Sequence, residues 1–186
     1  MQRSTLLRQG AITEIVGALS SGRTSLLLAC VRDVTRAGAV AALVDADGVF
    51  DPATATAAGV DLARVLWVRC GGCRRTALRA ADVLVRCPGF ALVALDVGES
   101  PPRLSLAEAF RLRLAVRRTG AALVVLARRR VAGGSAVLAV ETRRAALGWA
   151  GVGATPTRLA GMGTRLQVLR KQGAPALPLE RCWWVA

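Results

Sequence analysis

The octapeptide Gly17-Ala18-Leu19-Ser20-Ser21-Gly22-Arg23-Thr24 lies between two apolar segments of different length. Residues 11–16 form a β-branched run of strand length, and residues 25–34 form an apolar run of helix length. The octapeptide fits the phosphate-loop pattern G-x-x-x-x-G-K-[ST], except that Arg23 replaces the lysine. Glycines at both ends let backbone N–H groups curl around phosphate oxygens at a helix N-terminus. We therefore predict a strand, a phosphate-binding loop and a helix over residues 11–34.

The same segment predicts a nucleotide-binding site. Thr24 is placed to hold Mg²⁺ through its hydroxyl, and Asp96, which ends the apolar run 90–95, is placed to support the ion through water. Arg23 keeps a positive charge, but its planar guanidinium is bulkier than an ammonium group. An alternative interpretation is that the loop serves only as a turn. The predicted nucleotide-binding residues are Gly17, Ser20, Ser21, Gly22, Arg23, Thr24, Ser25 and Asp96, of which Thr24 and Asp96 are the predicted Mg²⁺ ligands.

Apolar runs of strand length alternate with helical patterns up to residue 127. We predict strands over 11–16, 40–44, 65–68, 90–95 and 121–127, and helices over 25–34, 53–59, 76–87 and 104–118. This alternation is typical of a parallel sheet covered by helices on both faces. Beyond it, Gly/Pro turns separate strand patterns at 135–140, 164–170 and 181–185, which predict an antiparallel extension of the sheet.

The predicted fold class is therefore α/β, with a mostly parallel central sheet flanked by helices and a C-terminal antiparallel extension. A chain of 186 residues that is 53% hydrophobic suits one domain, in which 1–10 form a short extension and 128–186 a basic one. No apolar run reaches the roughly 18 to 20 residues that span a bilayer, and the first residues lack an apolar signal core. We expect a cytoplasmic protein with no membrane contact.

Positive charge is concentrated in the second half of the chain. Residues 1–102 carry eleven arginines against nine carboxylates, whereas residues 103–186 carry fourteen arginines and Lys171 against three carboxylates. This surplus predicts contact with a polyanion, and nucleic acid is the commonest one in a cytosol. A compositional preference for arginine is the alternative, but it does not explain why acids are scarce in one half only. The predicted DNA-binding residues are Arg128, Arg129, Arg130, Arg143 and Arg144.

Five cysteines lie mostly in apolar runs, which suits buried thiols in a reducing compartment and not a disulfide framework. The spacing Cys70-Gly-Gly-Cys73 is typical of metal and redox motifs. There is no second cysteine pair and no histidine to complete a zinc site, and a lone C-x-x-C lacks the other ligands of a site, so we predict neither a metal centre nor redox chemistry at this motif.

Separate motifs resemble the RecA recombinase family, in the same order and at the same spacing. The family loop reads E-I-x-G-x-x-S-S-G-K-T, and its D-A-E, D-P and G-V-D motifs have counterparts here. The matching segments are Glu14-Ile15-Val16-Gly17, Ser20-Ser21-Gly22, Asp45-Ala46-Asp47, Asp51-Pro52, Gly59-Val60-Asp61 and the strand 91–96. The resemblance covers residues 10–127 and implies a RecA-like phosphate-loop core with ATP and Mg²⁺ as its cofactors.

Differences from the family pattern imply weakened catalysis. Asp47 stands where the family has the glutamate that activates the attacking water, and a missing methylene withdraws a base whose placement tolerates only about 1 Å. The chain reads Ala127-Arg128-Arg129-Arg130 where the family has the Asn-Gln pair that closes the strand after Val125 and senses the γ-phosphate. With Arg23 in the lysine position, we predict no efficient ATP turnover, and the degenerate Asp47 is the only candidate catalytic residue.

Other differences concern filament formation and DNA. The family's polymerising N-terminal arm and its C-terminal domain have no counterpart in residues 1–186, so we expect no RecA-type filament. The expected DNA-binding loops are a short one at 98–104 and an Arg/Gly-rich one at 130–153. A shortened core without an intact ATPase is similar to the ImuA family, which implies a nucleoid-associated role in SOS-induced translesion synthesis and mutagenesis.

That resemblance implies binding to ImuB, an inactive relative of Y-family polymerases, and contact with RecA or DNA. An active DNA-stimulated ATPase of recombinational repair and a SulA-like inhibitor of cell division are the alternatives. In the RecA family, the N-terminal arm of one protomer adds a helix and a strand to the edge of its neighbour's sheet. The resemblance implies that the receiving edge strand is kept here, and we predict that a similar helix and strand of ImuB pair with it. A covering loop of the same chain is the alternative. The predicted partner-binding residues are Val65, Leu66, Trp67, Val68 and Val83.

Overall fold

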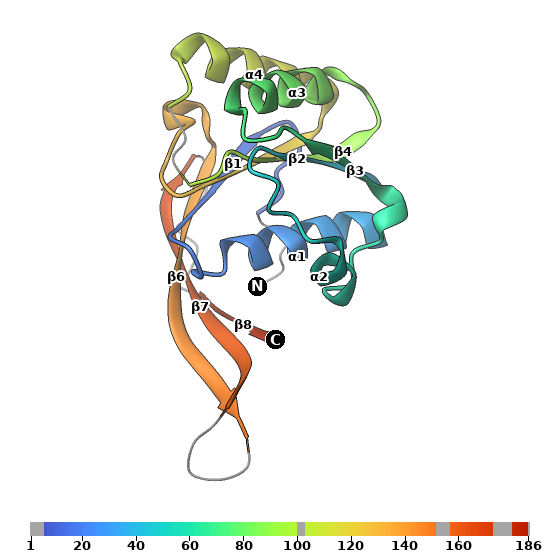
Figure 1. Cartoon of the computed structure of the whole chain (residues 1–186). Helices are drawn as coiled ribbons and strands as arrows, with labels where there is room; N and C mark the ends of the chain where they lie inside the picture. Colours follow the sequence, from blue (N-terminus) through green and yellow to red (C-terminus); the bar gives the residue numbers. More distant parts are fainter. Residues whose placement is uncertain (1–5, 100–102, 152–156, 173–179, 186) are drawn as a thin grey trace.

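The computed structural model describes residues 6–99, 103–151, 157–172 and 180–185 (Figure 1). The order of elements alternates strands and helices up to β5 and consists mainly of strands thereafter. The elements are β1 (Ile12–Val16), α1 (Arg23–Arg36), β2 (Val40–Asp45), α2 (Pro52–Ala57), the 3-10 turn η2 (Leu62–Arg64), β3 (Val65–Arg69), α3 (Arg74–Arg86), β4 (Phe90–Asp96), α4 (Leu106–Thr119), β5 (Ala122–Ala127), the 3-10 turn η3 (Gly133–Ser135), β6 (Leu138–Ala150), β7 (Arg158–Lys171) and β8 (Glu180–Val185).

The eight strands form one sheet in the order β3-β2-β4-β5-β1-β6-β7-β8. Every neighbouring pair from β3 to β6 is parallel, and β7 and β8 then add in antiparallel orientation. The predicted α/β class, mostly parallel sheet and antiparallel extension are therefore confirmed. The order also places β3 at one edge of the sheet, where the resemblance to RecA implies an edge strand.

Helices cover both faces of the parallel strands, with α3 and α4 on one side and α1 and α2 on the other (Figure 1). Alternate residues of β4 supply the two cores: Val93 packs with the α3/α4 layer, and Leu92 packs with α1. Burial on both faces explains why the central strands read as continuous apolar runs in the sequence. None of the described helices is long and apolar enough to cross a membrane.

Local signals set the helix ends. Ser105 caps α4 in a capping box with Glu108, whose carboxylate accepts from the Ser105 N–H at 2.8 Å, and Gly120 ends the helix with φ +78°. Asp51 caps α2 by accepting hydrogen bonds from the backbone of Ala53 and Thr54. These caps lie within two residues of the predicted boundaries.

The hairpin of β6 and β7 is longer than predicted and extends away from the body of the protein (Figure 1). The structure gives strands of 13 and 14 residues where the sequence predicts 135–140 and 164–170, and most of the predicted DNA loop at 130–153 is strand. The prediction was wrong because both faces of the projecting part reach solvent. Exposed arginines, alanines and glycines then remove the apolar alternation that marks a half-buried strand.

Glu14 of β1 is fully buried and fixes the segment that follows β5. One of its carboxylate oxygens accepts the N–H groups of Val131 and Ala132, each at 2.7 Å, and the other pairs with Arg130 at 3.2 Å. Three donors compensate the desolvation of this carboxylate. The bonds position the connection from β5 to β6, whose Val131 and Ala132 pack in the core beneath α3 and α4.

Candidate functional site

The phosphate loop occupies the turn between β1 and α1, and two glycines let it approach its neighbours. A Cβ atom at Gly17 would collide with the side chains of Thr142 and Ser21. Gly22 has φ +89°, and a Cβ atom there would collide with Thr164. Any larger residue would therefore force the loop away from β6 and β7, and at position 22 it would also be strained.

Hydroxyl groups from the C-terminal strands fasten this loop. The hydroxyl oxygens of Thr142 on β6 and Ser21 lie 2.7 Å apart, and the Thr142 hydroxyl also lies 3.2 Å from the carbonyl of Val16. The Thr164 hydroxyl on β7 donates to the Ser21 carbonyl at 3.1 Å. All are buried, so the loop is held in the interior by specific partners. Neither threonine could be predicted as a loop partner, because β6 and β7 join the loop only through the tertiary fold.

The start of α1 is shaped to attract an anion. Its N-cap Gly22 provides no side-chain acceptor, and the first turn contains no acidic residue. The first N–H groups of a helix lack intrahelical partners, and the helix dipole is positive at this end. Thr24 is exposed and Ser25 is partly exposed, and Ser20 adopts φ +57° at the exposed tip of the loop.

Arg23, in the lysine position, is buried and turned back onto its own loop. One guanidinium nitrogen donates to the Gly17 carbonyl at 2.7 Å, and the other pairs with the carboxylate of Glu99. Burial lowers the pKa of Arg23, Asp96 opposes this shift, and Arg128 adds to it. The guanidinium thus has protein partners where a loop lysine has phosphate oxygens.

Asp96 lies beside this guanidinium at the end of β4. It is buried and accepts the N–H of Gly98 at 2.9 Å. Burial raises its pKa, although the bond from Gly98 and the charge of Arg23 work in the opposite direction. The structure therefore brings the loop, Arg23 and Asp96 together at one edge of the sheet.

Asp47, in the position of the water-activating glutamate, is held by an ion pair. Its carboxylate lies 3.1 Å from a guanidinium nitrogen of Arg74, the first residue of α3. The preceding Asp45 is structural, because its carboxylate accepts three backbone N–H groups, of Gly48, Val49 and Phe50. A base that is engaged by a guanidinium is poorly placed to take a proton from water.

The predicted DNA-binding arginines fall into different surroundings. Arg128 and Arg129 are exposed just after β5, close enough to the loop for Arg128 to affect Arg23. Arg130 is structural, since it bonds to Glu14 and to the Gly133 carbonyl. Arg143 and Arg144 are exposed on β6, where Arg143 pairs with Glu141 at 2.8 Å. The surface near the loop is thus a smaller basic patch than the sequence predicts.

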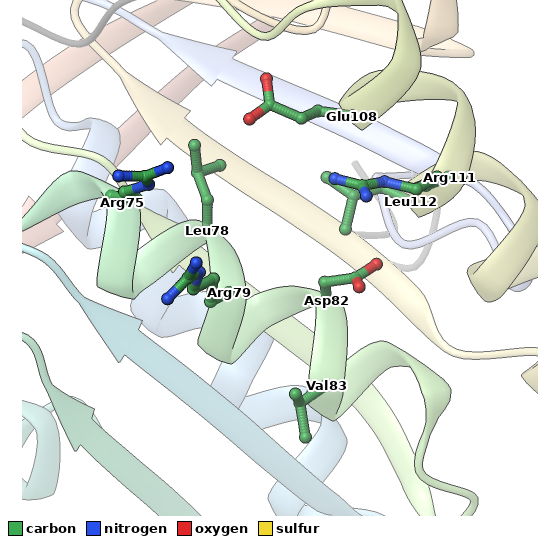
Figure 2. A pocket seen from close by; sticks show the side chains of 8 residues that line it. All are labelled: Arg75, Leu78, Arg79, Asp82, Val83, Glu108, Arg111 and Leu112. Atoms are coloured by element: carbon green, nitrogen blue, oxygen red, sulfur yellow. The ribbon is translucent and has the colours of Figure 1, made fainter.

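The predicted partner-binding residues lie on the β3 edge and on α3. Leu66 is 44% exposed on the edge strand, and Val83 is 60% exposed on α3 (Figure 2). Trp67 is partly buried by Phe50, whose ring centroid lies 5.1 Å away, and its N–H donates to Asp45. Val65 and Val68 pack at the margins of the two cores. Exposed apolar groups therefore flank an edge strand that, within the described part of the chain, pairs with β2 alone.

The arrangement of β1, glycine loop, α1 and Asp96 defines a phosphate-loop α/β protein. The family model of the RecA N-terminal domain matches residues 5–108, more than half of the chain, and the protein belongs to this family. The resemblance of the motifs to RecA is thereby confirmed.

Curated relatives match the same part of the chain. Protein RecA of Borreliella afzelii (strain PKo) is 37% identical over 99 residues, which cover 53% of this chain and 27% of the relative. Protein RecA of Rippkaea orientalis is 42% identical over 90 residues, 48% of this chain and 26% of the relative. Protein RecA of Tropheryma whipplei is 39% identical over 101 residues, 54% of this chain and 23% of the relative. The match spans about a quarter of the length of these relatives.

Proposed function

We propose that the protein is a non-catalytic or weakly catalytic RecA-like accessory protein of the ImuA type, acting in SOS-induced translesion DNA synthesis and mutagenesis. The observation that carries this proposal is the engagement of Arg23 by Gly17 and Glu99. The ion pair between Asp47 and Arg74 supports it, because the cation and the base of the RecA site are both occupied by neighbouring side chains. A protein that acts only by binding partners needs this fold, but it does not need Arg23 and Asp47 to be free for catalysis.

ATP with Mg²⁺ is the cofactor we propose for this site. The uncapped N-terminus of α1 and the exposed position of Thr24 in its first turn suit the phosphate groups. Thr24 would offer its hydroxyl to the ion and Asp96 would act through water, while the ion would supply charge neutralisation for the phosphates. In the proposed state the nucleotide is retained to order the loop, and it is turned over slowly or not at all.

Hydrolysis of ATP in the presence of single-stranded DNA is expected to stay at background. Misplacing a catalytic group by about 1 Å costs about 100-fold, so turnover should lie at least that far below Protein RecA measured in parallel. The combined variant Arg23→Lys, Asp47→Glu should also remain inactive, because Glu99 and Arg74 would engage the introduced side chains. A phosphate-release assay is the measurement. Turnover near that of Protein RecA would refute a non-catalytic role.

We also propose weak, sequence-independent DNA binding by Arg128 and Arg129. Reversing both charges with Arg128→Glu and Arg129→Glu should weaken DNA binding. The negative slope of the logarithm of the association constant against the logarithm of the salt concentration should become shallower by about 2, since each phosphate contact releases about 0.9 of a counterion. The matched control reverses Arg75 and Arg79, which are exposed on α3, and should leave binding nearly unchanged. Fluorescence anisotropy over a salt series measures both. An unchanged slope in the Arg128/Arg129 variant would exclude this patch as the DNA contact.

The proposed protein partner is an ImuB-type polymerase relative, with contact to RecA as a further proposal. An arm-like helix and strand of ImuB would add to β3 and lie on α3. Support comes from the position of β3 at the sheet edge and from the exposed side chains of Leu66 and Val83. Addition of a strand satisfies the outward backbone groups of an edge, and apolar side chains beside it supply specificity.

Val83→Asp is expected to weaken ImuB binding by roughly tenfold or more, because burial of an unpaired charge costs more than about 1.4 kcal/mol. Leu106→Asp is the matched control, because Leu106 is an exposed apolar residue on α4 and its change should have little effect. Calorimetry on variants with native circular dichroism spectra tests this. Equal affinities of the two variants would place the interface elsewhere.

A further inference from the structure

Cys70 and Cys73 lie at the two ends of a tight turn between β3 and α3. The N–H of Cys73 donates to the carbonyl of Cys70 at 3.0 Å, and Gly71 and Gly72 have φ +56° and +81°. Positive φ at both central residues is typical of a type I′ turn, whose first and last Cα atoms lie within about 7 Å. Disulfides join Cα atoms about 4.4–6.8 Å apart, so the backbone of the turn places the two Cα atoms in a range that a disulfide can span after rotation of the side chains.

The turn is fixed from outside as well as from within. The N–H of Cys70 donates to the Asp45 carbonyl at 3.0 Å, and the N–H of Gly72 donates to the Ala46 carbonyl at 2.6 Å. Both acceptors belong to the segment that leads to Asp47. A turn anchored in this way loses little conformational freedom when its ends are joined.

The two thiols differ in surroundings. Cys73 is exposed at the N-cap of α3, and its sulfur accepts a hydrogen bond from the Thr76 hydroxyl at 3.1 Å. This bond, followed by the bond from the Thr76 backbone, lowers the pKa of the Cys73 thiol. Cys70 is buried, and burial raises the pKa of its thiol. An accessible thiol that ionises more readily, beside a shielded thiol, is the arrangement of an attacking and a resolving cysteine.

We infer that Cys73 and Cys70 form a reversible oxidation site that reacts with hydroperoxides. The ionised Cys73 sulfur attacks a peroxide oxygen, so that an S–O bond forms and the O–O bond breaks. Cys73 becomes a sulfenic acid, and the departing oxygen takes a proton from solvent and leaves as water or as an alcohol. The Cys70 sulfur then attacks the Cys73 sulfur, and the hydroxyl group leaves as water with the Cys70 proton. The two thiols are oxidised by two electrons, the peroxide is reduced, and a dithiol reverses the reaction.

The Cys70/Cys73 turn lies next to both the proposed partner edge β3 and the residue that holds Asp47. Arg74, which follows Cys73, holds Asp47, and Cys70 follows the edge strand β3. The disulfide would therefore lie between the proposed partner edge and the degenerate catalytic position. The inference does not depend on the proposed function, because the chemistry involves only the turn.

Trypsin provides a direct test, because cleavage after Arg69 and Arg74 releases one peptide that contains both cysteines. The full-length protein is treated with hydrogen peroxide, alkylated without reduction and analysed by mass spectrometry. We expect the peptide 70–74 to become two hydrogen atoms lighter and resistant to alkylation, several-fold faster than Cys87 is oxidised, and to recover with dithiothreitol. Slower or equal oxidation compared with Cys87 would overturn the inference.

Variants separate the roles of the two sulfurs. Cys70→Ala should stop the reaction at a sulfenic acid on Cys73 that dimedone traps, whereas Cys73→Ser, which keeps a favoured N-cap residue, should leave Cys70 reduced. Thr76→Val should slow the oxidation several-fold without changing the product, and Cys87→Ser is the control that should behave as wild type. Oxidation of Cys70 in the Cys73→Ser protein, or a product that links two chains, would contradict the assignment.

Discussion

The burial of a guanidinium inside a phosphate loop is the constraint on which the arrangement of this site depends. Arg23 leaves water to bond with Gly17 and Glu99, and a buried cation without partners would cost several kcal/mol. Asp96 supplies a further negative charge. Glu99 therefore has a defined role: it provides the countercharge that an arginine in this position requires.

The loop backbone keeps the RecA form for a separate reason. The glycines, the uncapped start of α1 and the hydroxyl bonds to β6 and β7 fix the backbone independently of the residue at position 23. Substitution of the lysine thus changes the charge chemistry of the site without unfolding it. The carboxylate of Asp47 is held in turn by Arg74, so the two polar groups of the site each have a partner from another element.

The sequence predicted those parts of the structure that rest on local pattern. The run 11–34 carries its own strand, glycine loop and helix signals, and the apolar strands up to 127 carry the burial signal of a parallel sheet. Glu99 and Arg74 could not be predicted, because their roles arise from pairing across the fold. The structural role of Arg130 could not be predicted for the same reason, since its partner Glu14 lies 116 residues away along the chain. The length of β6 was missed because its exposed part has no apolar face.

The central claim is that Glu99 competes with nucleotide phosphate for Arg23. The most direct measurement is the equilibrium affinity of the full-length protein for a fluorescent ATP analogue, compared between wild type and Glu99→Gln, with Glu108→Gln as the control. Removing a charge-assisted bond worth about 1.5 kcal/mol or more should tighten binding roughly tenfold in Glu99→Gln alone. Equal or weaker binding by Glu99→Gln, with a native circular dichroism spectrum, would contradict the account.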